Sequence, residues 1–129
     1  MSYEYEAGVC NINQYQQKRR YLMAVIGFTV AGVLALFAYS FNLPPLTTAA
    51  VFAAVFAGFE GLYQGRLSFC AGFASKGIKS EGEGGQTEEV SEQDLDEDRE
   101  MARRIHYYSI TSSLFVTAVF YAATYTGLP

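Results

Sequence analysis

Two cysteines and one histidine are the side chains best suited to bind a metal or to carry redox chemistry. Cys10 precedes the first long apolar run, Cys70 follows the second, and His106 stands at the start of the third. Two thiolates with an imidazole suit zinc, and thiolates suit Cu(I). The sequence has no Cys-x-x-Cys pair and no obvious fourth ligand. It therefore favours inert packing cysteines, with a metal or thiol redox site at Cys10, Cys70 and His106 as the alternative.

Glu60 is an acidic side chain within the second apolar run. Ionisable groups in a membrane span are costly and often functional. Glu60 also falls near the expected C-terminal end of its helix, where a negative charge opposes the helix dipole. We therefore expect a structural salt bridge from Glu60 to Arg66 or to the basic triplet Lys18-Arg19-Arg20, with a proton or ion site as the alternative.

Three long apolar runs must position these side chains. Residues 21–41 carry no charge, residues 43–59 carry none before Glu60, and no charged residue follows position 106. A helix needs about 20 apolar residues to cross the hydrocarbon core. The sequence therefore predicts an all-α integral membrane protein with three transmembrane helices, at about 21–41, 44–64 and 106–126.

The spans divide the chain into four expected regions. They are a polar N-terminal tail (1–20), a tight transmembrane hairpin (21–64), an acidic loop with the start of the third helix (65–105), and the third span (106–129). The Gly-rich stretch 80–86 is typical of a flexible linker. Ser91 with Asp94 resembles a capping box. We therefore expect one continuous helix from Glu92 to Thr126, about 52 Å long, that projects from the membrane.

The basic residues set the expected orientation. They fall in two groups: one precedes the first span, and the other lies between the second and third spans (Lys18, Arg19, Arg20; Arg66, Lys76, Lys79, Arg99, Arg103, Arg104). The Pro44-Pro45 turn and the C-terminal end have none. Positive charge stays on the cytoplasmic side of a membrane. The N-terminus and the acidic loop are therefore expected in the cytoplasm, and the C-terminus outside.

Small residues repeat every four positions along the first two spans. These residues are Gly27, Ala31 and Ala35 in the first span, and Ala49, Ala53, Ala57 and Gly61 in the second, with a second lane of Ala50, Ala54 and Gly58 beside them. In lipid, small residues at this spacing let two helix backbones approach closely. The expected role is packing within the hairpin. The second span carries two adjacent lanes of this kind, so docking of a foreign helix is the alternative for the lane that the hairpin leaves free.

The acidic residues are strongly clustered, which excludes several classes of protein. Ten of the 13 acidic residues fall between positions 81 and 100, and the net charge is −4. This distribution is not that of a basic nucleic-acid binder, and two cysteines do not make a disulfide-dense module. The stretch lacks the calcium-loop pattern, and the spans lack a haem-ligating histidine. No phosphate loop or catalytic triad appears, so we expect no enzyme, no cofactor and no small-molecule substrate.

Several short motifs resemble a group of small prokaryotic membrane proteins of similar length. The motifs are Cys10-Asn11-Ile12, Lys18-Arg19-Arg20 before a span with Gly27, Leu43-Pro44, Gly61-Leu62-Tyr63-Gln64, and Phe69-Cys70. The hairpin is also faintly similar to the transmembrane hairpin of some membrane-bound rhodanese proteins, although this sequence has no rhodanese domain. The resemblance implies a multi-pass protein of a prokaryotic plasma (inner) membrane. It also marks Cys10, Asn11 and Cys70 as the positions to test first.

These observations together favour a non-enzymatic membrane protein that is an accessory or assembly subunit of a larger membrane complex. Its expected partners are membrane lipid and that complex, with no nucleic acid. The alternative is a cytoplasmic-face thiol redox or metal-binding protein that uses Cys10 and Cys70. Self-association through the second span into a pore is a third hypothesis.

Overall fold

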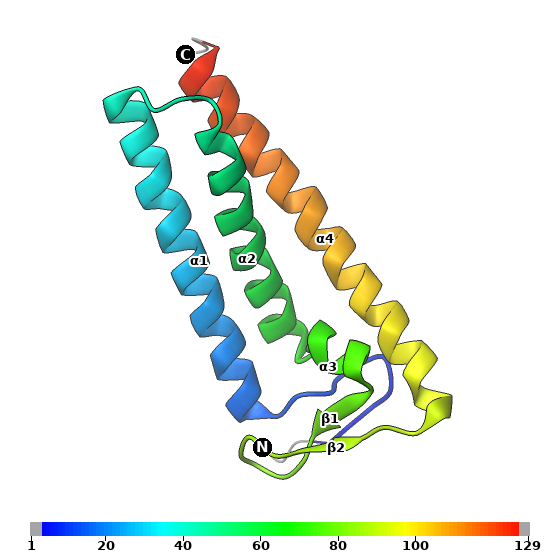
Figure 1. Ribbon diagram of the computed structural model, residues 1–129. Coiled ribbons are helices and arrows are strands. Elements are labelled where there is room, and N and C mark those ends of the chain that lie inside the picture. The colour runs from blue at the N-terminus through cyan, green and yellow to red at the C-terminus, as the bar shows by residue number, and fades with distance from the viewer. Residues whose placement is uncertain (1–3, 127–129) are drawn as a thin grey trace.

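The computed structural model describes residues 4–126, which fold mainly as helices (Figure 1). Three long helices run the length of the molecule, and a short helix and a two-stranded sheet lie at one end. In chain order the elements are α1 (Gln14–Phe41), α2 (Thr47–Leu67), α3 (Ala71–Lys76), β1 (Ile78–Ser80), β2 (Thr87–Glu89) and α4 (Glu92–Tyr125). The predicted all-α character therefore holds for most of the chain, and the hairpin β1–β2 is an addition to it.

The first helix begins earlier than the predicted span, and the second is shifted toward the C-terminus. α1 begins at Gln14, seven positions before the predicted start at 21, because the Asn13 side chain caps it by accepting a hydrogen bond from the Gln16 backbone N–H (3.1 Å). It ends where Asn42 adopts a left-handed backbone (φ 52°). α2 begins at Thr47 rather than at 44, after the Pro44-Pro45 turn, and ends at Ser68 (φ 53°). Asparagine tolerates this backbone region well, and serine enters it less often.

The third long helix begins where the sequence predicts. α4 starts at Glu92 and runs to Tyr125, and its 34 residues correspond to about 51 Å. The predicted capping box is not formed, since the Ser91 side chain makes no capping hydrogen bond. Glu92 and Asp94 in the first turn instead complement the positive end of the helix dipole.

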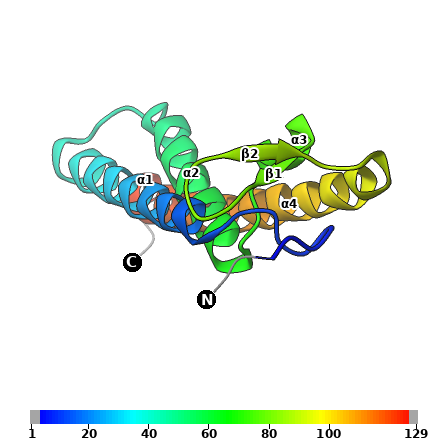
Figure 2. The ribbon, with the colours of Figure 1, turned by 90° about the horizontal axis from the view of Figure 1, so that it is seen from below.

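The predicted tail 1–20 and loop 65–105 do not hang free from the helices. Their described parts fold into one layer, which we call the cap: residues 4–13 and 68–90, at the end of the molecule where α1 and α4 begin (Figures 1 and 2). β1 and β2 pair antiparallel within it, with Ile78 opposite Glu89 and Ser80 opposite Thr87. The expected flexible linker 80–86 is the loop of this hairpin.

α2 lies between α1 and α4 and contacts both (Figure 1). Its contact with α1 is made through glycine: a Cβ added to Gly27 would lie 2.6 Å from the Gly58 backbone nitrogen. Its contact with α4 includes the Tyr63 and Ser112 hydroxyl groups, 2.7 Å apart. α3 packs on α4 at the cap through a small apolar cluster that includes Phe69 and Ile105.

One helix of the described chain, α1, is long and apolar enough by length and composition to cross a membrane. Only 22% of the apolar 18-residue stretch of α1 is buried inside the protein, so most of this apolar surface faces outward. α2 and α4 fall short of the same criterion, because α2 carries Glu60 and Gln64 and α4 carries several hydroxyl side chains. Of the three predicted spans, this criterion therefore supports the first.

Candidate functional site

Asn11 joins the N-terminal segment to the chain that follows α2. Its side-chain amide donates to the Cys70 carbonyl (3.1 Å), and its side-chain oxygen accepts from the Cys70 N–H (2.7 Å). Its backbone N–H donates to the Ser68 carbonyl, and its carbonyl accepts from the Ser80 N–H. Asn11 is fully buried, and these four bonds satisfy it. The side chain and backbone of this one residue therefore join the N-terminal segment to Ser68, Cys70 and Ser80 of the cap.

Asn13 fixes the hairpin loop against the start of α1. While its oxygen caps α1, its amide nitrogen donates to the carbonyls of Gly82 and Gly84, both at 2.9 Å. Gly82 has φ +67°, a backbone conformation that other residues rarely adopt. The Gly-rich sequence therefore provides the shape that lets its carbonyls meet Asn13.

Asp98 anchors the N-terminal segment to α4. Its carboxylate accepts from the Tyr5 hydroxyl (2.9 Å) and from the Gly8 N–H (2.8 Å), and the residue is fully buried. The Lys79 ammonium lies 4.3 Å from the centre of the Tyr5 ring. Charge-assisted hydrogen bonds of this kind are about twice as strong as neutral ones. Asp98 thus serves as a structural anchor within the acidic stretch.

Arg20 connects α1 to the buried Cys70 thiol. Its Nη2 atom donates to the Cys70 sulfur (3.0 Å), and its guanidinium carbon lies 6.0 Å from the centre of the Phe73 ring. Arg20 therefore contacts Cys70, just before α3, and Phe73, within α3, so its guanidinium group lies at the cap.

Cys10 makes a different contact. Its thiol donates to the Glu4 carbonyl (2.9 Å). Burial raises the pKa of this thiol above its ordinary value, and the carboxylates of Glu6, Glu4 and Asp98 act in the same direction. A backbone hydrogen bond at Glu6 opposes them. A raised pKa leaves little thiolate at neutral pH, and the thiolate is the form that reacts and binds metal.

Glu60 and His106 form a polar pair between α2 and α4. His106 Nδ1 lies 2.8 Å from Glu60 Oε1, and the Gln64 amide contacts the same oxygen at 3.4 Å. The Glu60 side chain is largely buried, and its Oε2 atom has no hydrogen-bond partner. The partner of Glu60 is therefore His106 on α4 rather than Arg66 or the triplet Lys18-Arg19-Arg20, because α4 passes next to this turn of α2.

The three predicted metal ligands have three separate sets of contacts. Cys10 bonds to Glu4, Cys70 accepts from Arg20, and His106 faces Glu60. Within residues 4–126, no three histidine, cysteine or acidic side chains gather as a metal site would require. Neither Cys10 nor Cys70 forms a disulfide bond. The described residues thus contain no ligand cluster that would support the thiol or metal function.

The small residues predicted to pack the helices fall into two groups. Gly27, Gly58 and Gly61 lie in the contact of α1 with α2, and Ala31 is buried beside them. Ala35 and Ala57 are half-buried. Ala49 and Ala53 are exposed. The contact with α1 thus uses Gly58 and Gly61, one from each lane of α2, and leaves Ala49 and Ala53 exposed near the Pro-Pro turn.

Sequence reasoning missed the roles of Asn13, Arg20 and Asp98. A signal for Asp98 was present, because it begins a buried stripe along α4 with helical spacing (Asp98, Ala102, Ile105, Ser109, Ser113, Thr117). No comparable spacing marks Asn13 or Arg20, whose partners are distant in sequence.

Comparison with known proteins adds no assignment: no protein-family model, curated protein or solved structure matches this chain. The structure defines a mostly helical protein with one helix able to cross a membrane and a folded cap at one end. The resemblance to small prokaryotic membrane proteins stays a prediction.

The chemistry of Cys10 can be tested by its rate of maleimide labelling. We expect slow labelling near neutral pH and a rate that still rises above the ordinary thiol pKa, because the thiol ionises late. Glu6→Gln removes a nearby negative charge, so it should lower the pKa and speed labelling at a fixed pH. Mass spectrometry of the labelled peptides would follow Cys10 separately from Cys70. Glu89→Gln is the matched control, and equal rates for the two variants would contradict this electrostatic explanation.

Proposed function

We propose that the protein spans a prokaryotic plasma membrane three times and serves, without enzymatic activity, as an accessory or assembly subunit of a larger membrane complex. In this arrangement α1, α2 and the C-terminal part of α4 lie in the membrane, with the cap in the cytoplasm. One observation carries the proposal: apolar side chains cover the outer faces of the helices, while Ala49 and Ala53 leave an exposed alanine lane at the start of α2.

The distribution of polar side chains along α4 supports its insertion. Ser109, Ser113 and Thr117 lower the average apolarity of α4, yet all three are buried and lie on one helix face. The outward side chains above His106 are uncharged and mostly apolar, and include Phe115 (72% exposed) and Leu114 (57% exposed). An aqueous protein rarely exposes so large an apolar surface. In a membrane, lipid would contact this apolar surface, while the hydroxyl groups stay buried.

The contacts of α2 with α1 support its insertion at the same depth. The close approach at Gly27 and Gly58 joins the two helices along their middle turns. The 21 residues of α2 correspond to about 31 Å, close to the thickness of a bilayer core. Two of its polar side chains, Glu60 and Gln64, lie toward the cap and are buried, and Arg66 is exposed at its cap end.

The open alanine lane supports a role in a complex. Ala49 and Ala53 are exposed on α2, whereas large side chains such as Leu36 and Tyr39 cover the outer face of α1. Helices associate in lipid by close packing at small residues, so this lane offers a docking face for another helix. The cap adds a rigid cytoplasmic surface, because residues far apart in sequence are joined in it by buried hydrogen bonds.

The proposal is tested by isolating a tagged copy from carbonate-washed native membranes in mild detergent. We expect the protein to remain in the washed membranes and to migrate on a native gel with a large complex at fixed stoichiometry. Ala49→Leu with Ala53→Leu should release it from that complex, because larger side chains hold the partner helix away. Ala118→Leu with Ala123→Leu, on exposed positions of α4, is the matched control. A stable monomer without a stoichiometric partner would refute the subunit role.

A further inference from the structure

A cleft of about 290 Å³ opens between α3 and α4, where α4 passes the cap. Its lining combines two guanidinium groups, one imidazole and one hydroxyl group around a small floor residue (Arg99, Arg103, His106, Ser75 and Ala102). None of these lining residues carries a carboxylate. This composition is unusual in a chain with net charge −4 and a strongly acidic segment in the same helix.

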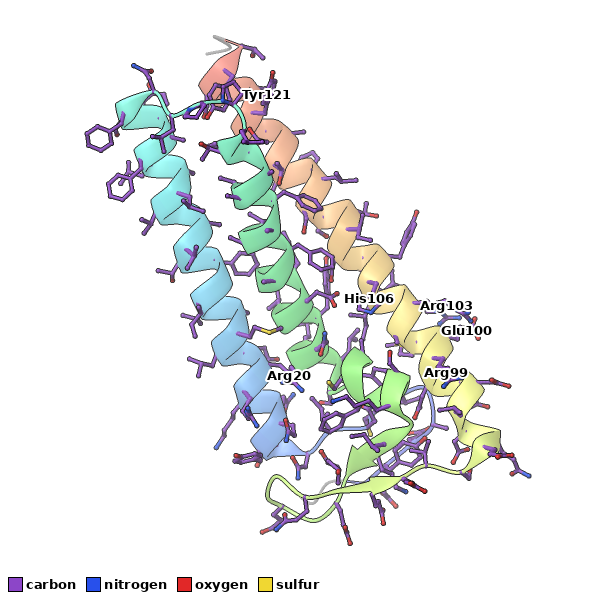
Figure 3. The ribbon with its side chains drawn as sticks, in the orientation of Figure 1. Arg20, Arg99, Glu100, Arg103, His106 and Tyr121 are labelled. Atoms are coloured by element: carbon purple, nitrogen blue, oxygen red, sulfur yellow. The ribbon has the colours of Figure 1, made fainter. Side chains whose placement is uncertain are left out.

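The basic groups of the cleft come from successive turns of α4. Arg99, Arg103 and His106 follow one another at i, i+4 and i+7, so they are neighbours on the helix surface and line the cleft together. Figure 3 shows His106 on the side of α4 that faces α2, and Arg99 and Arg103 on the other side. Ser75 comes from α3, on the opposite wall. An anion in the cleft would therefore meet donors from two elements.

The two arginines have no charge partner of their own. Between residues 4 and 126, no ion pair or side-chain hydrogen bond involves Arg99 or Arg103, whereas the neighbouring Arg104 pairs with Glu100 at 3.5 Å. His106 Nδ1 is held by Glu60, which leaves its Nε2 atom available to the cleft. A guanidinium group binds phosphate oxygens through two parallel N–H donors. The unpaired N–H donors of the cleft thus suit a phosphate group.

The surface directly above the cleft is apolar. Ile110 and Leu114 follow Arg103 at i+7 and i+11 on nearly the same face of α4, and they are 43% and 57% exposed. No charged residue of the sequence lies beyond His106. A ligand that fills both parts would have an anionic head at the arginines and a hydrocarbon chain along the helix.

We propose that this cleft binds the headgroup phosphate of an anionic phospholipid, with an acyl chain along Ile110 and Leu114. The proposal rests on the membrane insertion proposed above, which places Arg103 and His106 at the level of the lipid headgroups. It does not depend on membership in a complex. Anionic lipids attract basic residues at the cytoplasmic surface, and an organised cleft adds selectivity to that attraction.

The test is native mass spectrometry of the purified full chain, titrated in detergent with phosphatidylglycerol, phosphatidylcholine or inorganic phosphate. We expect one tightly retained phosphatidylglycerol, weaker retention of phosphatidylcholine, and no saturable binding of inorganic phosphate in the same range. Arg99→Gln with Arg103→Gln should weaken phosphatidylglycerol binding about tenfold or more. Arg66→Gln with Arg104→Gln makes the same change in net charge at exposed positions outside the cleft, and it should leave binding nearly unchanged.

Three outcomes would overturn the proposal. Equal losses in the two double variants would show a diffuse charge effect rather than a site. Saturation by inorganic phosphate at the same concentrations would assign the cleft to a free anion. Full retention by Arg99→Lys with Arg103→Lys, which keeps the charge and the fold but removes the planar fork, would refute the bidentate geometry. A protein that migrates alone on the native gel yet selects phosphatidylglycerol would refute only the subunit role.

Discussion

Gly27→Ala is expected to destabilise the protein, whereas the same substitution at Gly32 on the same helix is not. A Cβ at Gly27 would lie 2.6 Å from the backbone nitrogen and 2.8 Å from the Cα of Gly58. Both atoms belong to the backbone of α2, so no side-chain rotation relieves the clash and the helices must separate. Overpacking of this kind costs about 1–3 kcal/mol. At Gly32 no atom lies within 4 Å of the added methyl group.

Gly27→Ala and Gly32→Ala should therefore have different effects on the free energy of unfolding. Alanine is the better helix former by roughly 0.5–1 kcal/mol, so Gly32→Ala should be neutral or slightly stabilising. Gly61→Ala should behave like Gly27→Ala, because its Cβ would lie 2.6 Å from the Arg20 carbonyl oxygen. Gly27 and Gly61, where alanine is expected to destabilise the protein, lie at different positions along the same α1–α2 contact.

The buried Cys70 thiol provides the measurement. In a Cys10→Ser background, a dye that fluoresces on reaction with thiols would report thermal unfolding in mild detergent. Cys70 is buried and Arg20 of α1 contacts its sulfur, so separation of α1 from α2 should expose the reporter. We expect a lower midpoint for Gly27→Ala and Gly61→Ala and an unchanged or higher one for Gly32→Ala. Equal midpoints for Gly27→Ala and Gly32→Ala would show that the helices do not meet as closely as described.

The long helices were predictable because their signal is local. Long uncharged runs and the Pro44-Pro45 turn identify α1 and α2, and the acids after Ser91 place the start of α4. Small residues at four-residue spacing predicted a close α1–α2 contact, and Gly27, Gly58 and Gly61 lie in it. The sequence could not show which alanines of α2 remain open, because that depends on where α4 crosses.

The cap was not predictable in the same way. The basic triplet Lys18-Arg19-Arg20 indicated the end of a tail, although the helix begins before it at Gln14. The hairpin loop 80–86 has the composition of a linker and is held by Asn13 from far along the chain. Asp98 is one of the ten acidic residues between positions 81 and 100, and it is buried by partners about 90 positions away. Polar contacts between distant residues leave no periodic trace in a sequence.

Asn11→Asp is expected to detach the N-terminal segment of the cap from residues 68–80 at neutral pH. Aspartate keeps the oxygen that accepts from the Cys70 N–H, but it replaces the amide that donates to the Cys70 carbonyl. A carboxylate oxygen would then face a carbonyl oxygen at a fully buried position. An unsatisfied buried group costs about 1–3 kcal/mol, and more when it is charged. Asn42→Asp, at an exposed left-handed position that aspartate tolerates, is the matched control.

Hydrogen exchange of residues 68–80 would follow the detachment. We expect faster exchange at the Cys70 and Ser80 amides in Asn11→Asp, because the first bonds to the Asn11 side chain and the second to its carbonyl. The Asn42→Asp control should exchange like the parent protein. Unchanged protection of the Cys70 amide in Asn11→Asp would contradict the proposed role of Asn11.

Acid should partly rescue the Asn11→Asp variant. A protonated aspartic acid has the shape of asparagine and an O–H group that donates to the Cys70 carbonyl, so it restores both bonds. Burial of an unpaired carboxylate raises its pKa above the ordinary value of about 3.9, so the cap should close as pH falls through this raised pKa and reopen as pH rises again. The parent protein has no titratable group at this position and should lack that step. A purely steric effect of the substitution would give the same loss of protection at every pH.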